Sequence, residues 1–298
     1  MEVFITGGTG YVGSVLVEHL VAAGHDVRAL ARSSAAASRL EAAGALPVAG
    51  SLADVGVLEA AAGRADAVVH AAVDYAMTEE AQAVELDAVR ALLAGAGGHG
   101  TPFIYTSTGL VYGFDPAQSR DEDAELPAVS AQPVKAAAER LVLGVEDVDG
   151  MVMRAGLVYG RAGSGLVTGL IHAAESNGFA TYIGDGENTW TPVHVDDLAR
   201  LYVAALEHPV PGVYNAVGDT SFTFRRLAEA IAAITGAQPL SISPEQAAQT
   251  IGPAAAVLTI TGTTSSAKAR RTFGWSPGEA SIIQDVSEGS YAAQRAAV

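Results

Sequence analysis

The chain has 298 residues, of which 17 are basic and 33 acidic, giving a formal net charge of −16. With 49% hydrophobic and 17% charged residues, it has the composition of a globular protein and not of a disordered one. The acidic balance argues against nucleic acid or an anionic membrane surface as a partner, although an anionic small molecule needs only a local site. The lack of cysteine excludes disulfides, cysteine metal sites and thiol nucleophiles.

No apolar run approaches the roughly 20 residues that cross a bilayer, and no secretory signal opens the chain. We therefore expect a cytoplasmic protein. No internal repeat or low-complexity linker stands out.

In chain order, short apolar strands alternate with amphipathic helices through the first half. Strands are predicted at 3–5, 26–30, 45–49, 66–70, 103–106 and 151–154, and helices from 11 onward and at 35–43, 54–62, 78–93 and 135–143. Asp54 is the expected N-cap of its helix. The alternation predicts an α/β fold, a Rossmann-type doubly wound parallel sheet with right-handed crossovers.

The second half is less regular, with glycine-rich loops at 160–169 and 184–186 and a helix at 224–235. We predict a dinucleotide-binding core over 1–155, to whose sheet 191–216 returns. The rest of 156–298 is then a smaller, mostly substrate-binding lobe.

A glycine-rich turn lies between the first strand and the first helix. It satisfies two glycine patterns, G-x-x-G-x-x-G and G-x-G-x-x-G. The glycines permit a tight turn and a close approach of backbone to pyrophosphate, and the helix N-terminus offers N–H groups to phosphate. A merely tight turn without a ligand is the alternative, and the position between strand and helix disfavours it. The predicted cofactor contacts here are Thr6, Gly7, Gly10, Tyr11, Val12 and Gly13.

The end of the second strand distinguishes between two cofactors. An NAD site places an acid about 20 residues after the glycines, but here the chain reads Arg32-Ser33 and has no acid. Arg32 and Ser33 suit a 2′-phosphate, which favours NADP, with NAD as the alternative. The competing interpretation is that Arg28 and Arg32 are ordinary solvated residues.

The chain as a whole resembles an extended short-chain dehydrogenase/reductase of the NAD-dependent epimerase/dehydratase type. The matching motifs are 6–13, 50–52, 69–72, 105–108 with 111–113, 135–139, 154–160, 182–186, 193–199, 213–215 and 265–269. The resemblance implies further cofactor contacts from Ser51, Leu52, Ala71 and Ala72. It also implies a small-molecule substrate and a homodimer formed through paired long helices.

The family uses a hydroxyl residue, a tyrosine and a lysine. The resemblance places Thr108 at the hydroxyl position, with Ser107 beside it, and Lys135 at the lysine position, where it binds the nicotinamide ribose. The tyrosine, expected four residues before the lysine, is replaced by Ala131. Alanine cannot transfer a proton, so the chain resembles an atypical branch of the family. A surface lysine opening a helix is the alternative for Lys135.

Four groups are candidates to take over the proton transfer. Tyr75 follows the fourth strand, at the carboxyl edge of the sheet where ligands bind. Thr108 can bind the substrate oxygen directly. For Tyr112 and His194 we favour structural roles, although a histidine titrates near neutrality. The remaining histidines show no ligand spacing, so we predict no metal site.

The leading hypothesis is an NADP-dependent oxidoreductase that reduces a carbonyl of a small organic metabolite. Two alternatives keep an enzyme: a non-redox isomerase, lyase or cyclase, and a sugar-nucleotide epimerase or dehydratase. A third is a catalytically inactive nucleotide-binding protein, which Ala131 favours. Three aromatic residues are candidates to line an apolar substrate pocket or to lie in the core: Trp190, Tyr182 and Phe179.

Overall fold

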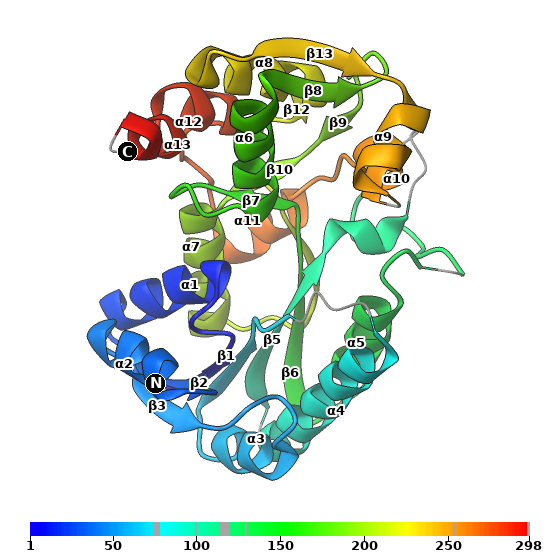
Figure 1. Ribbon diagram of the computed structural model, residues 1–298. Coiled ribbons are helices and arrows are strands. Elements are labelled where there is room, and N and C mark those ends of the chain that lie inside the picture. Colours follow the sequence, from blue (N-terminus) through cyan, green and yellow to red (C-terminus); the bar gives the residue numbers. More distant parts are fainter. Residues whose placement is uncertain (74–77, 99, 114–119, 129, 253, 297–298) are drawn as a thin grey trace.

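The computed structural model describes residues 1–73, 78–98, 100–113, 120–128, 130–252 and 254–296. Within these ranges, a sheet with helices on both faces forms one half of the molecule, and a second lobe built mostly from 156–190 and 218–296 packs beside it (Figure 1). Ala269, Phe273 and Trp275 pack on the sheet instead. The predicted α/β fold is confirmed.

The central sheet runs in the order β11-β6-β5-β4-β1-β2-β3, and each neighbouring pair is parallel. The strand order turns back at β1, which is typical of a doubly wound sheet. Its strands are β1 (Glu2–Thr6), β2 (Asp26–Ala31), β3 (Leu46–Ala49), β4 (Ala67–His70), β5 (Thr101–Thr108), β6 (Val148–Ala155) and β11 (Gly212–Ala216).

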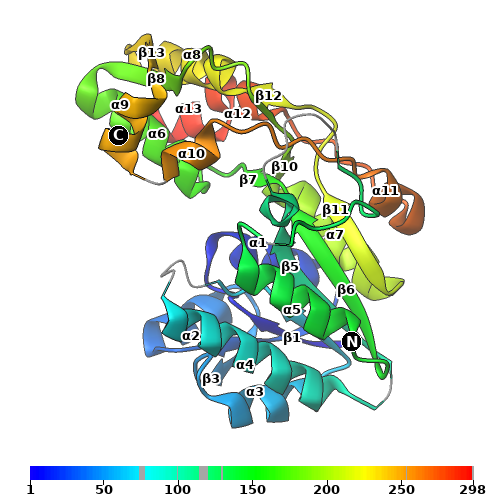
Figure 2. The same ribbon diagram turned by 90° about the vertical axis from the view of Figure 1, so that its right-hand side faces the viewer.

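Two hydrophobic clusters bury the two faces of this sheet. Along β1, Val3 and Ile5 point into one cluster and Phe4 into the other, because successive side chains of a strand alternate. One face is covered by α1 (Tyr11–Ala22), α2 (Ser34–Ala42) and α7 (Val195–Glu207), and the other by α3 (Val55–Ala62), α4 (Glu79–Ala96) and α5 (Pro133–Leu143) (Figure 2). The sheet is therefore buried on both sides.

The second lobe has its own apolar cluster. Leu227 and Ile231 of the amphipathic helix α8 pack there with Val167 and Val286. The elements outside the central sheet and its helices are η1 (Gly109–Tyr112), β7 (Leu157–Tyr159), α6 (Gly165–Asn177), β8 (Phe179–Ile183), β9 (Thr189–Trp190), β10 (Pro192–His194), β12 (Phe222–Thr223), α8 (Phe224–Thr235), β13 (Gln238–Ile242), α9 (Pro244–Ile251), α10 (Ala254–Leu258), α11 (Ala267–Phe273), α12 (Ile282–Glu288) and α13 (Ser290–Ala296).

Two local predictions differ from the structure. Asp54 stands at the N-cap of α3, but its side chain does not cap the helix and binds Ser51 instead. Helix α5 begins at Pro133, two residues before the predicted start, and Ala131 precedes it. Among the helices of the described ranges, none is long and apolar enough to cross a membrane.

Candidate active site

In the glycine-rich turn after β1, backbone atoms lie too close to Gly7 and Gly13 to leave room for side chains. Gly7 has φ +77°, and a Cβ there would lie 2.6 Å from the backbone nitrogen of Ala72. A Cβ on Gly13 would overlap the carbonyl oxygen of Gly7. Side chains are thus excluded at both positions by neighbouring backbone, as the sequence pattern requires.

Gly10 leaves the start of α1 open. It is the N-cap of α1, makes no side-chain cap, and no acid lies in the first turn of this fully described helix. The first N–H groups and the positive end of the helix dipole are therefore available to an anion. This arrangement fits a pyrophosphate group.

A cavity of about 410 Å³ lies where β2 and β3 end. Arg32, Ser33 and Ser51 line it. The Arg32 side chain is exposed and has neither a hydrogen bond nor an ion pair within the described ranges. Ser33 caps α2 by accepting a hydrogen bond from the Ala36 nitrogen at 3.2 Å, so its own hydroxyl hydrogen stays available to a ligand. The cavity has the size of a small-ligand site and the donors for a phosphate group.

Asp54 also lines this cavity, but its carboxylate is already engaged. Its Oδ2 accepts from the Ser51 hydroxyl at 2.8 Å and from the Ser51 nitrogen at 2.7 Å. These hydrogen bonds hold the pKa of the Asp54 carboxyl below its usual value. Asp54 therefore remains ionised and fixes the segment that follows β3.

The other predicted cofactor residues line or support the same edge. Thr6 binds the Nδ1 of His70 through its hydroxyl, 2.7 Å away. Tyr11 donates its hydroxyl hydrogen to the carbonyl oxygen of Gly160, 2.8 Å away, and so reaches the second lobe. The backbone of Ala71 and Ala72 packs against Gly7. Val12 and Leu52 are half-buried against the two apolar clusters of the sheet.

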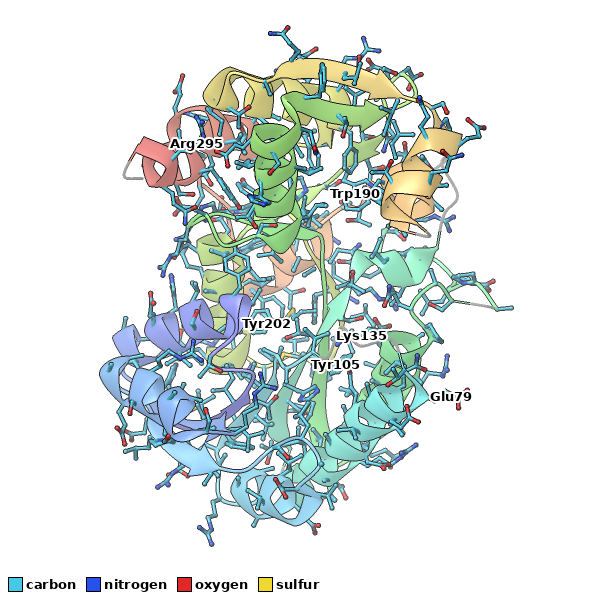
Figure 3. The ribbon with its side chains drawn as sticks, viewed as in Figure 1. Glu79, Tyr105, Lys135, Trp190, Tyr202 and Arg295 are labelled. Carbon is cyan, nitrogen blue, oxygen red and sulfur yellow. The ribbon has the colours of Figure 1, made fainter. Side chains whose placement is uncertain are left out.

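At the carboxyl end of β5, a buried carboxylate of α4 holds Lys135. The Lys135 Nζ lies 2.8 Å from Glu85 Oε1, which also accepts the hydroxyl hydrogen of Tyr105 at 2.6 Å. Figure 3 shows Lys135 and Tyr105 close together, and the Nζ lies 4.9 Å from the ring centroid. Burial would raise the pKa of Glu85, but the Lys135 charge and these hydrogen bonds hold it below its usual value. Lys135 is thus not a surface lysine.

A second buried carboxylate, Glu139 of α5, accepts the hydroxyl hydrogen of Ser107. The Ser107 hydroxyl donates to Glu139 Oε1 at 2.5 Å, and Arg154 donates to both oxygens of the same carboxylate at 2.6–3.2 Å. Thr108 is half-buried, and its Oγ1 accepts from the Leu110 nitrogen at 3.2 Å. Of the two hydroxyl candidates, Thr108 therefore keeps its hydrogen available to a substrate oxygen.

Tyr112 and His194, for which we favoured structural roles, each make a hydrogen bond within the fold. Tyr112 donates to the side-chain oxygen of Asn215 at 2.8 Å. His194 accepts from the Asp196 nitrogen at 3.2 Å, caps α7 and packs edge-on against Tyr159. Both groups are thus held by contacts within the fold.

Tyr75 and Asp74 lie outside the described residues. Trp190 donates to the carbonyl oxygen of Ile260 at 2.8 Å and packs edge-on against Phe224, so it belongs to the core of the second lobe. In the described part of the chain, no group of three or more metal-ligating side chains is clustered.

His70 predicts a pH dependence of stability. It is fully buried and stacked on Tyr105, and burial together with the nearby Lys135 charge lowers its pKa from 6.5 to about 4. Because the folded pKa lies below the unfolded one, this contribution is fully present above pH 6.5 and is lost as the pH falls toward 4. The loss amounts to about 3 kcal/mol.

The measurement is urea unfolding across this pH range, with His70→Asn as the reference, since asparagine can still form a hydrogen bond with Thr6 but does not titrate. The wild type should lose more stability than the variant between neutral pH and pH 4. Parallel curves for the two proteins would contradict the assignment.

Glu85 was not predicted from the sequence, and no role was predicted for Glu139. A signal for Glu85 was present: the buried positions of α4 are 85, 88, 89, 91, 92, 93 and 96, which form one continuous face of the helix. A carboxylate on an apolar stripe requires a buried partner, and Lys135 is that partner.

The model of the NAD-dependent epimerase/dehydratase family matches residues 3–217. The chain belongs to this family. A protein of Schizosaccharomyces pombe described as uncharacterized is 30% identical to this family member over 98% of the chain and 100% of its own length. A Stigmatella aurantiaca enzyme, 4-hydroxy-2-methyl-3-oxo-4-farnesyl-3,4-dihydroquinoline-1-oxide ketoreductase, is 31% identical over 72% of the chain and 67% of its own length.

Among solved structures, the family member is similar to the dTDP-glucose 4,6-dehydratase DesIV of Streptomyces venezuelae, solved with NAD and TYD bound. The TM-score is 0.81 at 22% identity, and the match covers 99% of this chain and 97% of that one. This likeness shows the shared fold. The family as a whole binds a nicotinamide dinucleotide, which the turn after β1 and the cavity beside β2 fit.

Proposed function

We propose that the protein is an NADP-dependent oxidoreductase that reduces a carbonyl group of a small, uncharged organic molecule. The observation that carries this proposal is Arg32, an exposed guanidinium without a carboxylate partner in the described ranges, at the cavity beside β2. A guanidinium there suits the 2′-phosphate that distinguishes NADP from NAD. Ser33 and the N-terminus of α2 add a hydroxyl donor and a positive helix end.

The residues of the site divide into those that hold the cofactor and those that act on the substrate. The turn from Gly7 to Gly13 receives the pyrophosphate, Arg32 and Ser33 the 2′-phosphate, and Lys135 the nicotinamide ribose. A nicotinamide bound there supplies the hydride. Thr108 donates a hydrogen bond to the substrate oxygen.

Because Ala131 replaces the family tyrosine, the proton must come from another group. We propose Tyr75, or water acting through Thr108, as the source. The described residues make Ser107 a poor donor, since its hydrogen is held by Glu139.

The distribution of positive charge favours an uncharged substrate. All 17 Lys and Arg residues fall within the described ranges. Those with carboxylate partners in and beside the second lobe are Arg154 with Glu139, Arg161 with Asp196, Arg200 with Glu279, Arg225 with Glu187, Arg270 with Asp219 and Arg295 with Glu175. Lys268 lies near Gly212, at the start of β11 and so at the edge of the sheet opposite the site. A nucleotide diphosphate would have to compete with carboxylates for these six arginines, while the exposed Arg226 and Arg271 have no carboxylate partner within the described ranges.

The first test is a fluorescence titration with NADPH and NADH. We expect NADPH to bind more tightly, and Arg32→Ala to weaken NADPH by about tenfold while leaving NADH unchanged. Arg39→Ala, an exposed arginine of α2 outside the cavity lining, is the matched control. Equal or tighter binding of NADH to the wild type would overturn the NADP assignment.

The second test is NADPH oxidation with a panel of uncharged ketones and aldehydes, with UDP-glucose as a competitor. We expect turnover that Thr108→Val lowers and that UDP-glucose does not inhibit. Intact NADPH binding without turnover of any carbonyl compound would instead support a nucleotide-binding protein without catalysis, the second candidate that Ala131 favours.

A further inference from the structure

The Lys135 ammonium is held by two fixed acceptors. Besides Glu85 Oε1 at 2.8 Å, it donates to the carbonyl oxygen of Thr106 at 3.3 Å. An ammonium has three N–H donors, so one remains. The Lys135 and Glu85 side chains are 12% and 7% exposed, so water offers little competition for the two bonds that are made.

The Glu85 carboxylate is also held by a second hydrogen bond, and it lies at a position where burying a charge is unfavourable. The same oxygen that binds Lys135 also accepts from Tyr105, a fully buried strand residue. Glu85 occupies the apolar stripe of α4, where a carboxylate is unfavourable unless it is paired. A leucine would serve packing better at this position, so stability alone does not account for a carboxylate there.

We propose that Glu85 is a positioning residue: together with the Thr106 carbonyl it takes up two N–H groups of Lys135 and directs the third to the nicotinamide ribose. This inference rests on the proposed function. Lys135 lies in the first turn of α5, and its ammonium group is carried by a flexible chain of four carbons. Without Glu85, the ammonium would be free to swing toward water, and ordering it on binding would cost conformational entropy.

The chain contains a matched control for this arrangement. Glu139 is also a buried carboxylate on a helix, pairs with a cation at 2.6 Å and accepts a hydroxyl hydrogen from β5. Its cation, Arg154, donates to Glu139 through Nε and Nη2 and lies over the Tyr112 ring, and no ligand contact is proposed for it. Neutralising Glu139 disturbs packing in the same way as neutralising Glu85, but it leaves Lys135 in place.

The experiment measures the affinity of the whole dinucleotide and of a truncated ligand for the variants Glu85→Gln, Glu85→Asp and Glu139→Gln. Circular dichroism verifies that each variant is folded. The ligands are the tighter of NADPH and NADH, and its adenosine half alone, 2′,5′-ADP or AMP. The half lacks the nicotinamide ribose and cannot contact Lys135. We expect Glu85→Gln to weaken the dinucleotide roughly fivefold to tenfold, in line with a charge-assisted contact, and to leave the adenosine half within about twofold. Glu139→Gln should change neither ligand.

Glu85→Asp is a second variant in case Glu85→Gln does not fold. It keeps the charge but shortens the side chain by one methylene, so it should lower dinucleotide affinity to a smaller extent. In a Lys135→Met background, Glu85→Gln should have no further effect. Unchanged dinucleotide affinity in Glu85→Gln, or an equal loss for both ligands, overturns the inference while the proposed function stands. A wild-type protein that binds neither dinucleotide overturns the proposed function, and the inference falls with it.

Discussion

Replacing Gly13 by alanine is expected to lower the free energy of unfolding by about 3 kcal/mol. The new methyl group would overlap the carbonyl oxygen of Gly7, which is backbone and cannot rotate away. Helix α1 would have to move off the turn, and this would disturb the packing of Val15 and Leu16 in the cluster that covers the sheet. Urea unfolding measures the loss.

Gly10→Ala is the control that separates folding from binding. A Cβ on Gly10 would meet only the Gly7 carbonyl oxygen, at 3.3 Å, so we expect stability to change by less than about 1 kcal/mol. Dinucleotide affinity should nevertheless fall at least about tenfold, because the methyl group occupies the space that a close approach of phosphate requires. A stable Gly13→Ala protein, or a Gly10→Ala protein with normal affinity, would contradict this account of the turn.

Replacing Glu139 by leucine is expected to cost about 3–5 kcal/mol. The change leaves the Arg154 guanidinium, 5% exposed, without its carboxylate. It also removes the acceptor of the Ser107 hydroxyl. Arg154 already has one buried nitrogen, Nη1, without a hydrogen-bond partner. An uncompensated buried charge is far more costly than the absence of the pair.

The double variant Glu139→Leu/Arg154→Met tests this explanation. Removing the charge as well should recover most of the lost stability, because two apolar side chains of similar volume pack where the ion pair stood. Thermal and urea unfolding of the wild type, the single variants Glu139→Leu and Arg154→Met and the double variant, analysed as a double-mutant cycle, give the coupling. Additive losses from the two substitutions would show that the pair does not act as a unit.

The sheet was readable from the sequence because its strands are short apolar runs that end at glycines or polar residues. The helix predicted at 224–235 matches α8 (Phe224–Thr235), since its apolar stripe repeats at helical spacing and Gly236 ends it. The start of α5 was misplaced by two residues, because the prediction did not use Pro133, which is favoured at the first helical position. Thr78 was predicted to open α4, and it caps that helix through its side chain.

Part of the candidate site could also be predicted from the sequence, and part could not. The turn after β1 and the Arg32-Ser33 pair follow from local spacing, since each belongs to one continuous segment. The partners of Lys135 and Ser107 do not, because Glu85 and Lys135 lie 50 positions apart and only the packing of α4 on α5 brings them together. Abundant alanine also leaves few side chains to mark which helix faces meet.

The hydrogen bond from Tyr11 to Gly160 ties the residue next to Gly10 to the segment that leads into α6. Gly163 packs directly against the Tyr11 ring, and Gly160 is in turn bonded to Tyr291 of α13. These contacts join the second lobe directly to the N-terminus of α1. Thermodynamic reciprocity then requires that whatever affinity a substrate gains from bound dinucleotide, the dinucleotide gains equally from bound substrate.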